Sequence, residues 1–194
     1  MKNFELYALS NSTETFSFNV FNGFSVDSIR SAIKACNKHT KKPIVVCVGS
    51  DLVLGDSLGP LIGTMLAQRK VPSFVYGTLN APVTAKEISC AKTHLKMIHP
   101  DGFIIAIDAA VGSREDVGLI KVSDKGLKPG LGVDKRLGVL GDCSVIGIVA
   151  EKSLQNYNLF NMTRLNLVYK MAEAISEGVA KYLFDFASEN QITA

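Results

Sequence analysis

The chain has 194 residues, of which 47% are hydrophobic and 20% are charged, a composition that is typical of a globular domain with one core and excludes a disordered chain. The formal charge is only +3 and no basic block exceeds Lys41-Lys42, so we expect neither a nucleic-acid nor a membrane partner. No signal peptide and no apolar run of membrane-spanning length is recognisable, so we expect a cytoplasmic protein.

The chain begins with a segment of weak pattern. Residues 1–24 alternate polar and aromatic positions and predict either an arm or an edge strand, ahead of a single domain over residues 25–194. Helical spacing follows over residues 26–38, with Ser25 as a candidate cap. The apolar run 44–48 then predicts the first core strand.

From residue 58 onward, helices and strands alternate. We expect a helix over 58–69, a strand over 74–78, a helix over 82–98, strands over 103–107, 118–122 and 145–149, and a closing helix over about 161–186. Glycine-rich residues 126–142 predict a loop, which at this length is typical of a functional or mobile segment. Strands that are apolar throughout and alternate with helices indicate a mostly parallel sheet covered on both faces. We therefore predict an α/β fold with three layers, α/β/α.

The cysteines and histidines do not form a reactive pattern. The four cysteines are far apart and lack a CxxC pair, which favours reduced packing residues in a reducing compartment. The histidines all precede Asp108 and show no metal-binding spacing, and none is placed to activate Cys143 as a nucleophile. The sequence therefore favours neither cysteine catalysis nor a zinc site.

Two aspartates follow predicted buried strands. Asp56 lies in the loop after strand 44–48, and Asp108 ends the run 103–107. The carboxyl ends of parallel strands line one crevice, where ligands usually bind. The two carboxylates are therefore candidates for one site with acid/base or metal chemistry.

Each aspartate also has a structural interpretation. Asp56 could cap the helix that starts near Leu58, although Ser57 could take that place and leave Asp56 available. Asp108 could be a buried residue satisfied by backbone N–H groups. The loop around Asp56 lacks the lysine and the glycine spacing of a phosphate-binding loop, and its carboxylates would repel a phosphate.

Several segments form an ordered set of motifs: Gly55-Asp56-Ser57-Leu58-Gly59-Pro60, residues 75–83, Ile107-Asp108-Ala109, residues 127–130, Gly141-Asp142, residues 146–149 and residues 161–165. Together they resemble the spore germination protease and its sporulation relatives, most closely the YyaC-type group. The similarity extends from about residue 43 to residue 180. It implies a three-layer α/β/α fold of the phosphorylase/hydrolase type, which hydrogenase maturation endopeptidases share.

The resemblance implies an atypical aspartic peptidase that degrades small acid-soluble spore proteins in the forespore or spore core. Asp56 and Asp108 match the two functional aspartates of that enzyme. We expect Ser57, Asp51 and Asp142 to contact the substrate, and we expect no metal or other cofactor. The expected partner is a protein or peptide substrate, and the sequence leaves a homo-oligomer open.

Two alternatives remain at this stage. The first is a non-catalytic relative that binds a spore protein or peptide in the same crevice. The second is a metal-assisted hydrolase in which Asp51 or Asp142 joins the pair to hold a divalent ion. In the hydrogenase endopeptidases a late histidine completes a nickel-binding set, whereas no histidine follows His99 here.

Overall fold

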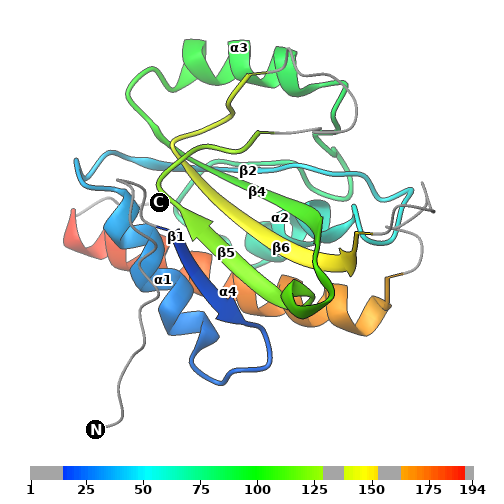
Figure 1. Cartoon of the computed structure of the whole chain (residues 1–194). Helices are drawn as coiled ribbons and strands as arrows, with labels where there is room; N and C mark the ends of the chain where they lie inside the picture. Colours follow the sequence, from blue (N-terminus) through cyan, green and yellow to red (C-terminus); the bar gives the residue numbers. More distant parts are fainter. Residues whose placement is uncertain (1–14, 129–137, 153–162, 191–194) are drawn as a thin grey trace, which may run out of the picture.

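The computed structural model describes residues 15–128, 138–152 and 163–190, which form helices on both faces of one sheet (Figure 1). The strands are β1 (Thr15–Asn19), β2 (Pro43–Cys47), β3 (Val75–Tyr76), β4 (Phe103–Gly112), β5 (Leu119–Ser123) and β6 (Cys143–Glu151). The helices are α1 (Ser25–Cys36), α2 (Leu58–Gln68), α3 (Ile88–Ile98) and α4 (Leu165–Glu189), with a short 3-10 helix, η1 (Arg114–Asp116). The predicted three-layer α/β fold is confirmed.

The six strands lie in the order β1-β5-β6-β4-β2-β3. Strands β3, β2, β4 and β6 run parallel to one another, and β5 and β1 extend the sheet by antiparallel pairing. The sheet is therefore mostly parallel, and its outermost strand on the antiparallel side is β1. Residues 1–14 of the predicted N-terminal segment lie outside the described residues.

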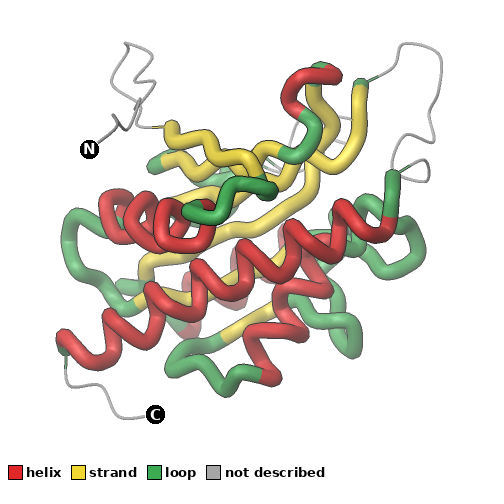
Figure 2. Tube along the Cα trace, turned by 90° about the horizontal axis from the view of Figure 1, so that it is seen from below, coloured by secondary structure: helices red, strands yellow, loops and turns green. Residues whose placement is uncertain are grey.

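Helices α1, α2 and α4 cover one face of the sheet, with α4 in contact with both of the others (Figure 2). The side chains that α4 buries recur at helical spacing: Val168, Met171, Ala172, Ile175, Val179, Leu183 and Phe186. On the other face α3 buries only Ile88 and Leu95, in a smaller core cluster. No helix within the described ranges is long and apolar enough to cross a membrane.

Helix α3 is shorter than the predicted helix over residues 82–98, because the residues before Ile88 form a β-bridge and a turn instead of the first helical turn. Val83 forms a β-bridge with Val48 at the end of β2. The backbone N–H and the hydroxyl of Thr84 both donate to the carboxylate of Glu87, which holds a turn immediately before Ile88. The segment before α3 therefore borders the end of β2.

The start of α1 also differs from the expectation. Ser25 is the first residue of the helix and not its cap, and Phe24 holds the cap position without a side-chain hydrogen bond. Part of the glycine-rich loop, residues 129–137, and the predicted helix start at residues 161–162 lie outside the described residues.

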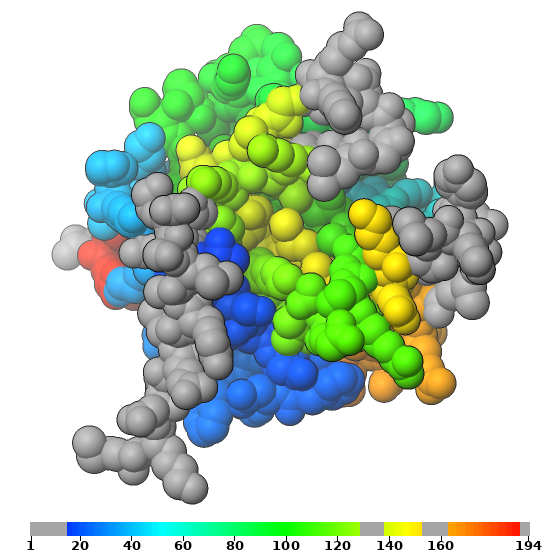
Figure 3. Space-filling model, viewed as in Figure 1, coloured from blue at the N-terminus to red at the C-terminus, as the bar shows by residue number. Residues whose placement is uncertain are grey.

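Strands β4 and β6 are longer than the predicted strands 103–107 and 145–149. They remain paired from Ile105 with Cys143 to Gly112 with Glu151, with a register shift after Ala110. Their far ends lie side by side on the molecular surface together with η1 (Figure 3). Asp108 therefore lies inside β4, and the prediction that it ends the strand is wrong.

Candidate active site

Asp108 lies where β4 has lost its strand partner on one side. The last residue of β2, Cys47, pairs with Ile107, and the N–H of Val48 donates to the carbonyl of Ile107 over 2.7 Å. On its other side Asp108 still pairs with Ile146 of β6. Beyond the end of β2 the chain continues into the loop that leads to α2, and the charge of Asp56 in that loop acts on Asp108.

That loop turns back on itself and carries Asp56 to the end of β2. The N–H of Ser50 donates to the carbonyl of Asp56 over 3.1 Å, and the N–H of Gly49 donates to the carbonyl of Val83 over 3.0 Å. Gly49 has a φ of 142°, and a Cβ added there would lie 2.1 Å from the Asp56 carbonyl oxygen. Only glycine allows this close approach of the two loop ends.

The structure does not use Asp56 as a helix cap. Ser57 holds the cap position of α2 without a side-chain cap bond, because its hydroxyl donates to the carbonyl of Leu54 over 2.6 Å. In the described part of the chain, the Asp56 carboxyl interacts with the backbone N–H of Ser50, not with the first turn of α2. Asp56 is half-buried, so its carboxyl stays available for chemistry.

The two carboxyl groups influence each other. The pKa of Asp108 is raised to about 8, mainly by burial and in smaller part by the negative charge of Asp56. The N–H of Ala109 donates to Oδ1 of Asp108 over 2.8 Å, and this hydrogen bond opposes the rise. Burial also raises the pKa of Asp56, and the N–H of Ser50 opposes that rise.

This arrangement gives the two aspartates different charges at neutral pH. Asp108 keeps its proton near pH 7, because its pKa is about 8. Asp56 is the member that ionises first, since its negative charge acts on Asp108 when Asp108 titrates. A neutral carboxyl within electrostatic reach of a charged one is suited to act with it as an acid/base pair.

The other predicted site residues do not all reach this pair. Asp51 is exposed in the same loop, and Ser57 is buried within it. Asp142 lies four residues before Ile146 along β6, about 13 Å from the row that contains Asp108. Its carboxylate accepts a hydrogen bond from the N–H of Ile104 over 2.8 Å. Asp142 therefore lies toward the opposite end of the strands from the two aspartates, and its contact with the substrate stays a prediction.

Sequence reasoning missed a cation on the same face as Asp108. Lys121 of β5 pairs with Ile146, which in turn pairs with Asp108, so the three residues form one row across the sheet. Lys121 is thus about 10 Å from Asp108 between backbones, and its ammonium forms an ion pair with Asp116 over 3.2 Å. Only the antiparallel register of β5 reveals this row, and the sequence carried no signal for that register.

A substitution at Gly49 tests how the loop is held. We expect Gly49→Ala to lower the free energy of unfolding by at least ~2 kcal/mol, because its Cβ collides with the Asp56 carbonyl and φ lies in a region that favours glycine. Gly23→Ala is the matched control, since nothing lies within 4 Å of its added Cβ. Equal urea denaturation midpoints for the two variants would contradict this role of Gly49.

Protein side chains near Asp56 and Asp108 would be needed to hold a metal ion there. Across residues 15–128, 138–152 and 163–190, no three His, Cys, Asp or Glu side chains lie close enough together to hold a metal ion. The metal-assisted alternative therefore lacks a third protein ligand within these ranges.

Three comparisons with known proteins bear on the chain. A family model described as "Protein of unknown function (DUF1256)" matches residues 17–178. The chain is 43% identical over 145 residues to the "Uncharacterized protein YyaC" of Bacillus subtilis (strain 168), covering 74% of this chain and 71% of that protein. The fold is similar to that of the [NiFe] hydrogenase maturation protease HycI from Thermococcus kodakarensis KOD1, with a TM-score of 0.53, 15% identity, and coverage of 78% of this chain and 98% of that one.

Proposed function

The chain belongs to the DUF1256 family, and we propose that it hydrolyses peptide bonds with Asp56 and Asp108 as its acid/base pair. The proposal is carried by the loop that returns Asp56 to the end of β2, where its charge reaches Asp108 and helps to raise the pKa of Asp108 to about 8. Perturbed carboxyls of this kind cluster at active sites. The likeness in fold to a hydrogenase maturation protease supports a peptidase architecture without supplying the chemistry.

In the proposed reaction the two carboxyls have opposite roles. Ionised Asp56 removes a proton from a water molecule, which attacks the carbonyl carbon of the scissile bond. Protonated Asp108 donates its proton to the carbonyl oxygen as negative charge develops there. Collapse of the tetrahedral intermediate then breaks the C–N bond, and the proton held by Asp56 passes to the leaving amine. As the C=O bond re-forms, a hydroxyl of the intermediate returns its proton to Asp108.

The proposed substrates are proteins or peptides of the spore, with small acid-soluble spore proteins as the first candidates. The motif resemblance around Asp56 and Asp108 supports this substrate class and a location in the forespore or spore core. Asp51 is exposed in the same loop as Asp56, which supports its proposed contact with the peptide.

Incubation of the purified chain with small acid-soluble spore proteins tests the proposal. We expect new peptide termini, detected by mass spectrometry, that are absent when the chain is omitted. Tight binding of these proteins without any cleavage would instead support a non-catalytic relative that uses the same crevice for recognition.

The pH dependence of cleavage follows from the two carboxyls. We expect kcat/KM to fall above about pH 8, because Asp108 then loses the proton that it must donate. At acidic pH it should fall as Asp56 becomes protonated, at a pH above the usual range for aspartate, since burial raises its pKa. A profile measured from pH 4 to 10 that stays flat through pH 8 would contradict the role of Asp108 as the acid.

A further inference from the structure

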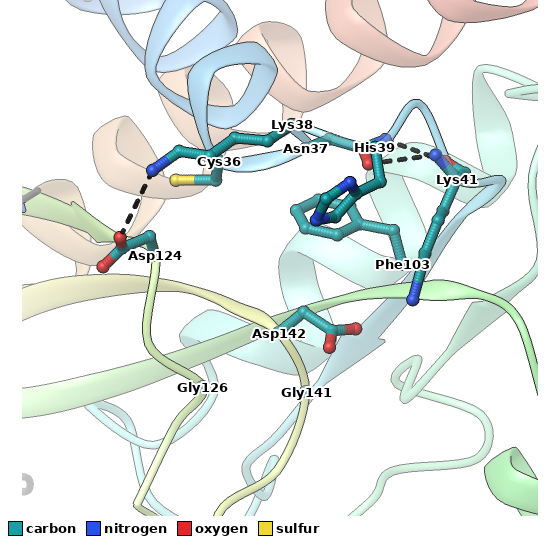
Figure 4. Close-up of a pocket in the computed structure, with 10 residues that line it drawn as sticks. All are labelled: Cys36, Asn37, Lys38, His39, Lys41, Phe103, Asp124, Gly126, Gly141 and Asp142. Carbon is teal, nitrogen blue, oxygen red and sulfur yellow. Dashed lines mark hydrogen bonds and ion pairs between the residues drawn. The ribbon is translucent and has the colours of Figure 1, made fainter. Parts of the chain in front are cut away.

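A cavity of about 330 Å³ (Figure 4) opens at the N-terminal end of β4, the opposite end of this strand from Asp108. It lies between the end of α1, the start of β4 and the segments that follow β5 and precede β6. Its lining is polar, with Lys38, His39, Asp124 and Asp142 around the aromatic ring of Phe103. The cavity is large enough to admit several water-sized molecules.

Two thiols meet beside this cavity. Cys36 is the last residue of α1, is half-buried and lines the cavity. Cys143 is the first residue of β6, is fully buried, and directly follows Gly141 and Asp142, which line the same cavity. The side chains of Cys36 and Cys143 form a hydrogen bond, and both pack against the main core cluster.

We propose that Cys36 and Cys143 form a peroxide-reactive dithiol site, in which oxidation by a small hydroperoxide entering the cavity joins the two sulfurs in a disulfide. Two thiols that share a hydrogen bond are neighbours, and a further approach brings their sulfurs to the ~2.05 Å of an S–S bond. Cys36 can supply this movement, because terminal helix residues are less constrained than those in the middle. The proposal is independent of the function proposed for the aspartates.

The surroundings assign different roles to the two thiols. The hydrogen bond with Cys36 raises the pKa of Cys143 well above its usual value, as do burial and the negative charge of ionised Cys36. Cys36 lines the cavity, so it is the sulfur that meets the oxidant. Cys143, without exposed surface, is the resolving thiol.

The reaction balances with hydrogen peroxide as the only oxidant. The Cys36 thiolate attacks one peroxide oxygen, the O–O bond breaks, and a sulfenic acid and hydroxide result. The hydroxide takes up the proton that Cys36 released and becomes water. The sulfur of Cys143 then attacks the sulfur of Cys36, the S–O bond breaks, and the leaving hydroxyl departs as a second water with the proton of Cys143.

The other two cysteines provide internal controls. Cys47 is buried in β2, where burial raises its pKa, and it is expected to stay a thiol. Cys90 is exposed on α3 and reports how strongly any exposed thiol is oxidised. A Cys90→Ser background removes disulfides between molecules that would otherwise form through this exposed thiol.

The test treats the native full-length Cys90→Ser chain with hydrogen peroxide, alkylates remaining thiols after unfolding, and maps the peptides without reductant. We expect one linked pair of peptides containing Cys36 and Cys143, released by dithiothreitol, with Cys47 alkylated. We also expect the melting temperature of the oxidised chain to rise, because the new bond closes a long loop.

Two further variants make the result decisive. With Cys143→Ala, Cys36 should accumulate as a sulfenic acid that dimedone traps, and with Cys36→Ser no linked peptide should form. The proposal is overturned if Cys36 and Cys143 both remain thiols at a peroxide dose that oxidises Cys90 in the wild-type chain. It is equally overturned if Cys36 is oxidised to the sulfinic acid while Cys143 stays a thiol.

Discussion

Asn in place of Asp108 is expected to lower the rate of peptide cleavage by about 10²–10⁴-fold, because the amide cannot deliver the proton that the carbonyl oxygen needs. Asp56→Asn should cause a loss of similar size, because it removes the base that activates water. Neither substitution changes the shape of the side chain much, and the N–H of Ala109 can still donate to residue 108. Cleavage of a spore protein, followed by mass spectrometry, measures both losses.

Asp101→Asn is the matched control for these variants. Asp101 is an exposed aspartate in the turn before β4, at the other end of the strand that carries Asp108. Its replacement removes the same formal carboxylate as Asp56→Asn and should leave cleavage unchanged. Full activity in Asp56→Asn would show that the pair does not carry out the reaction.

The same carboxyl should limit stability at alkaline pH. Asp108 has a pKa of about 8 in the folded chain, so between about pH 4 and pH 8 the folded state holds a proton that the unfolded state has released. The stability contributed by this proton is complete below pH 4 and is lost as the pH rises through 8. We therefore expect Asp108→Asn to raise the free energy of unfolding at pH 9 by on the order of 3–5 kcal/mol, and to change it little at pH 4.

Urea denaturation of both proteins at several pH values measures this difference. The gain should be smaller in an Asp56→Asn background, since the charge of Asp56 contributes to the raised pKa of Asp108. A difference between wild type and Asp108→Asn that stays constant from pH 4 to pH 9 would show that folding does not raise the pKa of Asp108, and the acid role would fail with it.

The sheet was largely predictable because its strands are continuous apolar runs. Residues 44–48 predicted β2 to within one residue, and the helical spacing from Leu58 predicted α2. The length of β4 was not predictable, because Asp108 interrupts the apolar pattern where the strand continues. That interruption indicates the candidate site. The backbone pairing of β4 continues through Asp108, although burial disfavours the charged form of this residue.

The composition of the site was only partly predictable. Strands ending near one another indicated Asp56 and Asp108, and the structure places them close enough for one charge to act on the other. Asp142 was grouped with them because it adjoins a strand, but it precedes β6 instead of following it. Lys121 was missed, because its row depends on the direction and register of β5.

The parallel pairing of β2 with β4 also determines when the candidate site comes into existence. Pro43 pairs with Phe103, so α2, β3 and α3 must all be synthesised before the two strands can meet. Contacts between such distant segments form late in folding, because closing a long loop costs entropy before the contact repays it. In a chain that is still unfolded the two aspartates are therefore separate, and Asp108 has the ordinary acidity of an exposed aspartate. Only a chain that has completed its tertiary structure holds a proton on Asp108 at neutral pH, which makes any activity of the pair a direct reporter of correct folding.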